Sequence, residues 1–435
     1  MDPSINPFIA GGIVPLEKII VGRKRASNVF SPLTYEGGSV GVYGDRGLGK
    51  SSLLCYIAHP PADWQEKYFQ NHIFVAFNCQ DTVIPFTPAN FWRQAVRHLN
   101  RKVEAGPLKE KCQALLAQEK GSKLNQHDFH DILDTAAKDK KRIVLVLDDF
   151  DYLIRTDSEH LEPTRAFLQG LRSLITRYSS KANLVVATRR SLEELCKPVT
   201  NLSTSPFSNG FTCYRLQLFR EAEIHQLVHW IEETDQLRFS DNEVKYICHL
   251  SGHHPQLAQI AASEVFDQRS ETGAPLDDLT PVGERFKSKA RHVFESLWAA
   301  ARDVERMLLM FVALQEQNGK IPQCHYDLGD LPVIFSQRER ELIELADRGL
   351  IRKRKDTFIW EIFSPIFDWW ILKEIESADP ERLDECRKVW GSLLTQKQAK
   401  RLGHLVDAAR ENKEFIRKFA QTVIQMAGWT LPIFG

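Results

Sequence analysis

The chain has 435 residues, and its 57 lysines and arginines balance its 57 aspartates and glutamates. Hydrophobic residues make up 43% and charged residues 26%, a composition that excludes a disordered or fibrous protein and predicts two or three packed units. The balanced charge also excludes a surface that attracts polyanions as a whole, so contact with nucleic acid would need a local basic patch.

The cysteines and the apolar runs narrow the class further. Eight scattered cysteines lack the CxxC or Cys/His spacing of a zinc site, and we expect reduced thiols. The first residues, MDPSINPFIA, do not join a basic segment to an apolar one as a secretory signal does. Because no stretch of about 18 uncharged apolar residues occurs, we expect no transmembrane segment and a cytoplasmic protein.

A repeated strand-then-helix pattern follows a lead-in at 1–37 that is punctuated by proline and glycine. The run SVGVYG at 39–44 predicts a short strand that stops at glycine, and KSSLLCYIA predicts a helix that ends before Pro60 and Pro61. Further apolar strands are predicted at 72–79, 142–151, 182–190 and 211–219. Such strands, separated by helices, predict a parallel sheet covered on both faces, with ligands at the carboxyl ends of the strands.

A glycine-rich motif lies between the first strand and its helix. Residues 44–51, GDRGLGKS, fit the pattern GxxxxGK[ST], in which glycines let successive N–H groups point at phosphate oxygens and the helix N-terminus adds a favourable dipole. We expect Lys50 to contact the β- and γ-phosphates of ATP and Ser51 to give its hydroxyl to magnesium. The residues predicted to bind the nucleotide here are Gly44, Asp45, Arg46, Gly47, Leu48, Gly49, Lys50, Ser51 and Ser52.

Acidic residues end the most hydrophobic run of the chain, RIVLVLDDFD at 142–151. Asp148 ends the predicted strand and can hold magnesium through water, so Ser51 and Asp148 are the predicted metal ligands. Asp149 is placed to polarise the attacking water, whereas Asp151 is interpreted as a structural cap. A solvated turn is the alternative for adjacent acids after a strand, but the apolar run and the upstream P-loop favour metal binding.

A third polar strand end lies in ANLVVATRR at 182–190. This strand brings Thr188 and Arg189 to the same edge, where an arginine can sense the γ-phosphate of the nucleotide. A plain surface arginine pair is the alternative, and it applies more to Arg190 than to Arg189. The predicted catalytic set is therefore Lys50, Asp149 and Arg189.

Helical periodicity replaces the strand pattern from about residue 220. Ser240 and Glu243 predict a capping box for one of these helices, and the Gly/Pro/Asp-rich stretch 272–283 predicts a domain boundary. Beyond the boundary we expect helices at 285–301, 303–317 and 336–349. The last of these is predicted to start with a capping box of Ser336 and Glu339 and to end at Gly349.

A β-hairpin is predicted after these helices, because the runs LIRKRK and FIWEIFS flank the turn residues Asp356 and Thr357. Helices followed by a hairpin suggest a winged helix-turn-helix. The predicted organisation is a lead-in at 1–37, a P-loop NTPase core at 38–219, a helical lid at 220–275, a winged-helix domain at 284–375 and a C-terminal helical tail at 376–435.

Basic residues gather on the predicted wing at 352–355, and Arg338 and Arg340 lie on the helix before it. These cations could grip DNA, with the wing on phosphates and the helix in a groove. They could instead belong to a solvated hairpin that faces acids of the same module, such as Glu339 and Glu341. Acids on the would-be recognition helix favour the second interpretation, so nucleic acid is a possible but not a favoured partner.

The motifs VGR at 21–23, GDRGLGKSSLL, LVLDDFD, VVATRR and LSGHHPQL occur in this order. With them the chain resembles, over about residues 15–375, the signal-transduction ATPases with numerous domains, the STAND class, and their archaeal-type ATPase relatives. The resemblance implies an α/β fold: a P-loop NTPase with a parallel sheet of the AAA+/STAND type, followed by a helical lid and a winged-helix domain.

The resemblance also implies roles outside the P-loop. Val21, Gly22 and Arg23 would border the adenine, and Arg189 would read the γ-phosphate. Pro255, in a GxP-like motif that begins at Gly252, would pack on the base. Taken from the residues alone, Gly252 and Pro255 can equally well end one helix and start the next.

A nucleotide-controlled switch is the function that the resemblance implies. ADP would keep the NTPase, lid and winged helix closed, and exchange for ATP would open them and promote assembly of a homo-oligomer. We expect ATP or ADP with Mg²⁺ as cofactors, slow ATP hydrolysis, and a protein partner for signal input or effector output. The alternatives are an initiator-like AAA+ ATPase that grips DNA with its winged helix, and a nucleotide-holding scaffold with negligible turnover.

Overall fold

A computed structural model describes residues 6–15, 23–34, 38–82, 87–117, 124–199, 206–235, 237–317, 331–354, 359–377 and 413–425. The chain divides into two compact units. The core unit comprises Ile13–Asp45 and Gly49–Leu216, and the helical unit comprises Met1–Gly12, Arg46–Leu48 and Gln217–Gly435.

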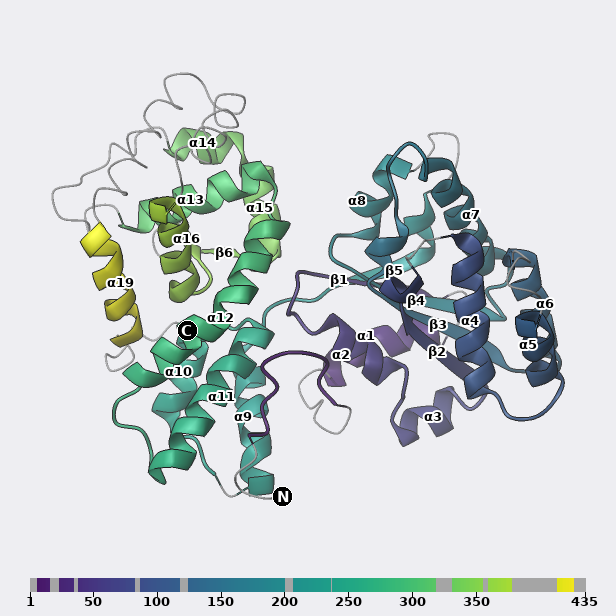
Figure 1. Cartoon of the computed structure of the whole chain (residues 1–435), viewed down its shortest axis with the longest axis horizontal. Helices are drawn as coiled ribbons and strands as arrows, with labels where there is room; N and C mark the ends of the chain where they lie inside the picture. The colour runs from purple at the N-terminus through teal and green to yellow at the C-terminus, as the bar shows by residue number, and fades with distance from the viewer. Residues whose placement is uncertain are drawn as a thin grey trace. The chain divides into compact units, whose positions relative to one another are not determined.

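A five-stranded parallel sheet with the strand order β2-β3-β4-β1-β5 forms the centre of the core unit (Figure 1). The strands are β1 (Ser39–Tyr43), β2 (His72–Asn78), β3 (Arg142–Asp148), β4 (Ala182–Thr188) and β5 (Phe211–Arg215). Each strand falls within a run predicted from the sequence, so the predicted parallel sheet is confirmed. Because the strands are parallel, their carboxyl ends lie at one edge of the sheet.

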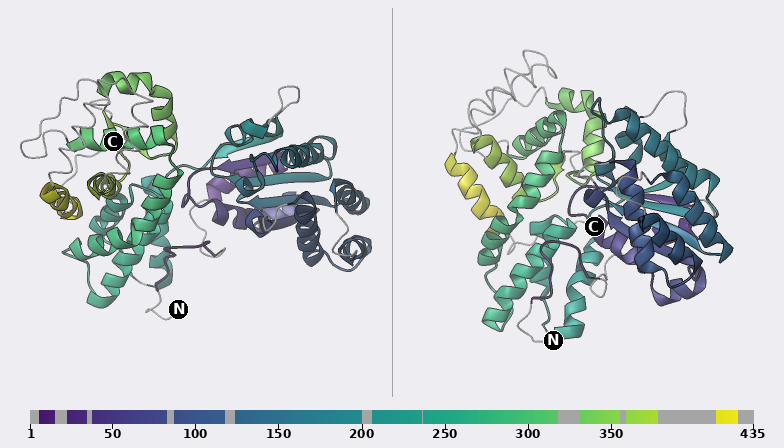
Figure 2. Two further views of the ribbon diagram at one scale, coloured as in Figure 1. Left: turned by 45° about the horizontal axis from the view of Figure 1, so that its top comes forward. Right: turned by 45° about the vertical axis from the view of Figure 1, so that its right-hand side comes forward.

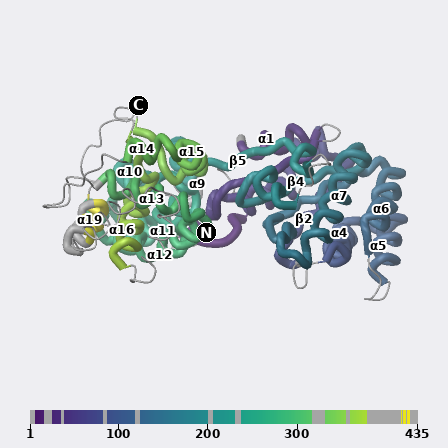
Figure 3. The backbone as a smooth tube through the Cα atoms, turned by 90° about the horizontal axis from the view of Figure 1, so that it is seen from above, coloured from purple at the N-terminus to yellow at the C-terminus, as the bar shows by residue number. Residues whose placement is uncertain are grey.

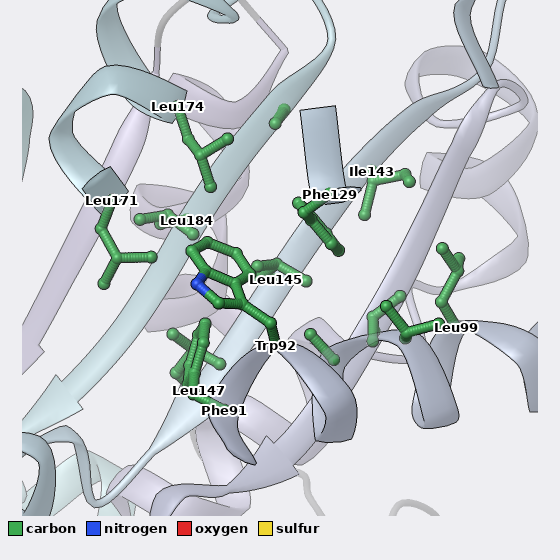
Figure 4. Close-up of a cluster of buried hydrophobic side chains, with 14 of the residues drawn as sticks. Phe91, Trp92, Leu99, Phe129, Ile143, Leu145, Leu147, Leu171, Leu174 and Leu184 are labelled. Carbon is green, nitrogen blue, oxygen red and sulfur yellow. The ribbon is translucent and has the colours of Figure 1, made fainter. Parts of the chain in front are cut away.

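Helices cover both faces of the sheet, which explains why its strands are continuous apolar runs. The helices of the core unit are α1 (Arg23–Leu33), α2 (Lys50–Ile57), α3 (Ala62–Tyr68), α4 (Pro88–Lys102), α5 (Pro107–Ala117), α6 (Gln126–Lys138), α7 (Leu161–Arg177) and α8 (Leu192–Cys196). On one face, Trp92 of α4 and Phe129 of α6 pack with Leu145 of β3 in a fully buried cluster (Figure 4). Helices α1 and α2 pack on the opposite face, and α5 and α6 lie side by side (Figure 3).

Helix α1 (Arg23–Leu33) lies within the lead-in at 1–37, where we predicted no helix. The helix buries Ala26, Val29, Phe30 and Leu33, which are spaced as one face of a helix. Pro32 obscured this pattern, because proline in a helix interior removes a hydrogen bond. Burial against the sheet outweighs that cost here.

The helical unit contains most of the remaining helices (Figure 2). They are α9 (Glu221–Asp235), α10 (Asp241–Ser251), α11 (Pro255–Thr272), α12 (Thr280–Ala300), α13 (Asp303–Gln317), α14 (Leu331–Gln337), α15 (Glu339–Asp347), α16 (Pro365–Ser377) and α19 (Lys413–Gln425). The predicted capping box of α10 is confirmed, since the Ser240 hydroxyl accepts the Glu243 N–H and the Glu243 carboxylate accepts the Ser240 N–H. Helix α11 packs against both of its neighbours in the chain, α10 and α12.

The predicted capping box of Ser336 and Glu339 is wrong. Ser336 lies inside α14, and the residue that precedes α15 is Arg338, whose side chain makes no capping hydrogen bond. Helix α14 already begins at Leu331, and the Arg338 N–H still bonds to the Ile334 carbonyl, so the chain is helical where we expected a helix start. The predicted end of this helix agrees more closely with the structure, because α15 ends at Asp347 and Gly349 follows it with φ +76°.

The predicted hairpin is confirmed as an antiparallel pair of β6 (Ile351–Lys353) and β7 (Trp360–Ile362). Its turn residues Asp356 and Thr357 lie outside the described residues, and the winged-helix assignment stays a prediction. Helix α19, from the predicted tail, packs against α12 and α16. Among the described residues, no helix combines the length and the apolar character needed to cross a membrane.

Candidate nucleotide-binding site

The turn between β1 and α2 has the backbone that the glycine-rich motif requires. The Gly44 N–H bonds to the Thr188 carbonyl at 3.2 Å and so ties the start of the loop to the end of β4. Gly49 precedes α2 with φ +89°, a left-handed conformation that a side chain would strain, and no side chain caps the helix there. The first N–H groups of α2 are therefore available to an anion.

Lys50 is buried beneath this loop, with 9% of its surface exposed. Its Nζ donates hydrogen bonds to the carbonyl oxygens of Gly44 at 2.7 Å and Asp45 at 3.0 Å. Burial lowers the pKa of the Lys50 ammonium, while nearby carboxylates, Asp151 foremost, raise it. The cation is thus held at the loop by groups that phosphate oxygens can replace.

The two predicted magnesium ligands lie together at the end of β3. The Ser51 hydroxyl lies near the Asp148 carboxylate, and Asp148 Oδ1 accepts the Asp149 N–H at 3.0 Å. Burial raises the pKa of Asp148, and the nearby Ser51 hydroxyl opposes that rise. An oxygen pair of this kind suits magnesium, which keeps several waters and uses few protein ligands. Accordingly, no cluster of three or more His, Cys, Asp or Glu suited to a metal occurs among the described residues.

Asp149, the predicted catalytic acid, is held by side chains that the sequence did not single out. Its Oδ2 accepts hydrogen bonds from Asn78 Nδ2 at 3.1 Å and from Gln80 Nε2 at 2.8 Å. Its backbone is left-handed, with φ +50°. Asn78 pairs with Asp148 in the parallel register of β2 and β3, so the end of β2 reaches the same edge. Asn78 could have been identified from the sequence only as a polar residue at the end of a predicted strand.

Asp151 connects the acidic turn to the end of β4. Its two carboxylate oxygens accept the Arg189 N–H at 3.0 and 3.1 Å, and burial raises the pKa of this carboxyl group. The guanidinium of Arg189 lies over the Tyr152 ring, 6.0 Å from its centroid. The structure therefore brings the backbone of Arg189 to the acidic edge.

The remaining predicted site residues are less closely grouped. Ser52 Oγ accepts the Val14 N–H at 3.1 Å, so its hydroxyl has a structural partner. Arg46–Leu48 belong by their contacts to the helical unit, where the Gly47 carbonyl accepts the Gln256 N–H at 3.1 Å. Pro255 is the buried first residue of α11. Gly22, like Val21, lies outside the described residues, and Arg23 begins α1, but its side chain is not described.

Comparison with known proteins agrees with this geometry. The family model described as AAA ATPase domain matches residues 22–187, and the model described as novel STAND NTPase 2 matches residues 127–316. A search of curated protein sequences found no match. The first model covers the P-loop and the acidic turn, and the second continues through the helices that follow the sheet.

Solved structures show the same fold. A Walker-type ATPase of Pyrococcus abyssi is 15% identical, with a TM-score of 0.52 over 82% of this chain and 96% of that one. The ORC2 protein of Aeropyrum pernix, solved as ADPNP–ADP complexes, is 13% identical, with a TM-score of 0.50 over 82% and 96% of the two chains. At these identities the likeness shows the fold alone, that of an α/β P-loop NTPase. The two family models, each of which matches less than half of the chain, indicate a P-loop ATPase of the AAA+/STAND type.

Proposed function

We propose that this protein binds ATP with magnesium, hydrolyses it slowly and uses the bound nucleotide as a conformational switch. The observation that carries the proposal is the packing of the P-loop helix against β3, which places the Ser51 hydroxyl near the Asp148 carboxylate. Ser51 lies in the first turn of α2 and Asp148 ends β3, so only the folded sheet brings them together. Their oxygens lie next to Lys50, which supplies the positive charge that a triphosphate requires.

Each residue of the edge has a task in this proposal. Ser51 and Asp148 would hold a magnesium ion, which would supply positive charge to the triphosphate of bound ATP. Lys50 exchanges its two carbonyl partners for phosphate oxygens. Asp149 accepts a proton from the attacking water, while Arg189 stabilises charge on the γ-phosphate. Asn78 and Gln80 keep the Asp149 carboxylate oriented for that step.

The proposed roles of Ser51 and Asp148 as magnesium ligands can be tested with Ser52 as the control. ATP affinity is measured in excess magnesium and in EDTA for the wild type and for the variants Ser51→Ala, Asp148→Asn and Ser52→Ala. We expect magnesium to tighten binding in the wild type and in Ser52→Ala, because the Ser52 hydroxyl accepts the Val14 N–H. This increase in ATP affinity should disappear in Ser51→Ala and Asp148→Asn. If magnesium increases the affinity fully in both variants, these residues do not bind the ion.

The switch is the second half of the proposal: ADP holds a closed state, and ATP opens it and promotes assembly of identical copies. Its support is the resemblance to the STAND class and the division of the chain into two compact units. Light scattering on the full chain with ADP, with ATP and with ATP plus the Asp149→Asn variant tests this half. We expect a larger mass with ATP, most of all in the variant. An unchanged mass in all three samples would contradict assembly.

The charges of the hairpin argue against DNA binding as the main function. Arg352 and Arg354 both pair with Glu361, and Arg354 also lies 3.7 Å from Glu316. Lys353 lies over the Trp360 ring, 5.5 Å from its centroid. Arginines that already pair with carboxylates gain less from contact with phosphate than free arginines do. We therefore expect no shift of duplex DNA at low salt, and a shift abolished by Arg352→Glu with Arg354→Glu would favour the initiator-like alternative instead.

Turnover separates the switch from the third alternative, a scaffold that holds nucleotide without hydrolysing it. Single-turnover assays with enzyme in excess measure the chemical step apart from product release. We expect ADP to form in the wild type and to form far more slowly in the Asp149→Asn variant. Equal rates for both proteins would indicate that Asp149 has no part in hydrolysis.

A further inference from the structure

Residues 6–10 lie along α11, since Asn6 contacts Ser263 and Ile9 contacts Gln259. The segment is drawn in dark purple beside the helices of this unit in Figure 1. Asn6 makes the central polar contacts. Its Nδ2 donates to the Ser263 carbonyl at 3.0 Å, to Ser263 Oγ at 2.9 Å and to Asp267 Oδ1 at 2.7 Å. Its Oδ1 accepts the Phe8 N–H at 3.0 Å. Both ends of the amide are therefore used, which selects asparagine at this position.

Phe8 supplies an apolar anchor two residues further on. Only 8% of the residue is exposed, and its ring meets Phe239 and Phe266 edge-on, with centroid separations of 5.9 and 6.3 Å. A buried aromatic side chain with a specific ring geometry is the kind of contact that dominates binding energy at interfaces. Beyond it, the Ile9 N–H donates to Gln259 Oε1 at 3.0 Å and so fixes the backbone.

These contacts are those of a bound peptide. The segment and α11 are separated by about 250 residues of sequence, and a side-chain amide, an aromatic anchor and a backbone N–H each meet a dedicated partner. Extended peptides are recognised in the same way, by pockets for alternate side chains and by polar contacts to the backbone. We call residues 6–10 the latch, and the latch groove is formed by Phe239, Gln259, Ser263, Phe266 and Asp267.

A flexible joint follows the latch. Gly11 and Gly12 are exposed, Gly12 has φ +92°, and a Cβ added to either would meet no atom within 4 Å. At Ile13 the chain passes from the helical unit to the core unit, and 54% of Ile13 is exposed. Two adjacent glycines with open space around them let the latch leave its groove without breaking other packing.

We propose that the latch groove also accepts the latch of a second copy of this chain, so that exchange of the latch links neighbouring copies. An exchanged segment makes the same contacts in the partner as in its own chain, and therefore no new surface is required. Attachment to its own chain gives the segment an effective concentration of about 1 mM, so exchange needs a similar local concentration, such as an assembly provides. The inference goes beyond the proposed function and does not depend on nucleotide binding.

A labelled peptide tests the groove in the full-length protein without nucleotide. The variant with Asn6→Ala and Phe8→Ala empties its own groove, and the probe is an acetylated fluorescent peptide of residues 6–12. By fluorescence anisotropy we expect this variant to bind the peptide at least about tenfold more tightly than the wild type does. A peptide with Phe8→Ala, or a chain with Asp267→Ala added, should bind at least about tenfold more weakly. Absence of binding to the folded variant would overturn the proposal.

Cross-linking then tests whether the partner is a second copy. A chain with Asn6→Cys is mixed with a chain with Asp267→Cys under mild oxidation at a total protein concentration of about 1 mM, which matches the effective concentration of the attached latch. Mass spectrometry identifies the joined peptides. The chain that carries both substitutions is the control for a bond within one molecule. We expect a dimer joined between positions 6 and 267 in the mixture. If the double variant cross-links internally and the mixture yields no such dimer, the latch does not exchange and the proposal fails.

Discussion

The carboxyl edge of the sheet and the β6–β7 hairpin both concentrate charge, but they satisfy it in opposite ways. At the sheet edge, Asp148 and Asp149 accept hydrogen bonds from neutral donors, namely a backbone N–H and side-chain amides. At the hairpin, Arg354 meets Glu361 directly at 2.9 Å. A carboxylate held by neutral donors keeps its charge for a cation or a proton, whereas an exposed ion pair uses its charge locally and contributes little energy.

On this basis we propose that the sheet edge carries the chemistry and that the hairpin has a structural role. A motif alone could not make this distinction, since both regions show several charged residues in a short stretch of sequence. What separates them is the type of partner that each charge meets in the fold. The following predictions test the distinction, beginning with the largest expected effect.

Asp149→Asn should slow ATP hydrolysis by about a thousandfold, because the variant loses the proposed proton acceptor for the attacking water. Single-turnover hydrolysis measures this effect. ATP affinity should change little, since Asp149 is not a predicted ligand of the nucleotide or of magnesium. Asn78→Ala should cause a smaller loss in the same assay, because Gln80 still holds the carboxylate. Hydrolysis at the wild-type rate in Asp149→Asn would show that another group accepts the proton.

Lys50→Ala should weaken ATP binding by about 100-fold, the loss expected when charged hydrogen bonds to phosphate are removed. Fluorescence titration with a labelled ATP analogue measures the affinity. Lys353→Ala, in the hairpin, is the matched control: it removes a lysine of the same length that lies over Trp360, and ATP affinity should stay unchanged. An equal loss of ATP affinity in the two variants would show that the sheet edge and the hairpin do not differ in nucleotide binding.

Gly252→Ala should destabilise the helical unit by about 2 kcal/mol. Gly252 ends α10 with φ +53°, and an added Cβ would overlap the carbonyl of Phe363, which directly follows β7. Gly273→Ala is the control, because Gly273 ends α11 with φ +68° but has open space around it, so only the backbone strain of about 1 kcal/mol remains.

Urea unfolding of both glycine variants measures this difference, and ATP affinity is followed in parallel. If the hairpin is structural, Gly252→Ala should lower stability more than Gly273→Ala while ATP binding by the folded protein stays the same. Equal stability of the two variants would show that the close approach of Gly252 to Phe363 adds nothing.

The sequence predicted the sheet and the P-loop because both depend on local patterns. An apolar run such as 142–148 predicts a buried strand, and the spacing of Gly44, Gly49 and Lys50 predicts the loop. Asn78 and Gln80 were missed because their role depends on strand order: β2 adjoins β3 only in the folded sheet. Strand order is set by packing, and a single polar residue at a strand end does not indicate its neighbour.

Helix starts were the least predictable feature. The motif of Ser240 and Glu243 forms a capping box, while the same pattern at Ser336 and Glu339 does not. A capping box marks a helix start only where the residues before it are not helical, and Leu331 and Ile334 extend a helix across the second motif. Tertiary burial of these apolar residues therefore overrides the local signal.

The smallest predicted effect concerns the opposite end of β2. His72 lies against the rings of Phe69 and Phe74, and its ring nitrogens have no hydrogen-bond partner within the described part of the chain. Burial, with a contribution from Arg142, lowers the pKa of His72 to about 4. Between about pH 6.5 and 4 the unfolded chain binds a proton that the folded chain does not, so the free energy of unfolding falls as the pH falls.

His72→Phe keeps the ring and removes the titration. From pH 7 to pH 5 the wild type should lose about 1 kcal/mol more stability than this variant, after allowance for the partial exposure of the ring. Urea unfolding at the two pH values measures the difference. Identical losses would mean that water or a rearranged side chain satisfies the protonated ring. The start of β2 would then tolerate a charge. It would differ less from the end of the same strand, where Asn78 contacts the charged Asp149.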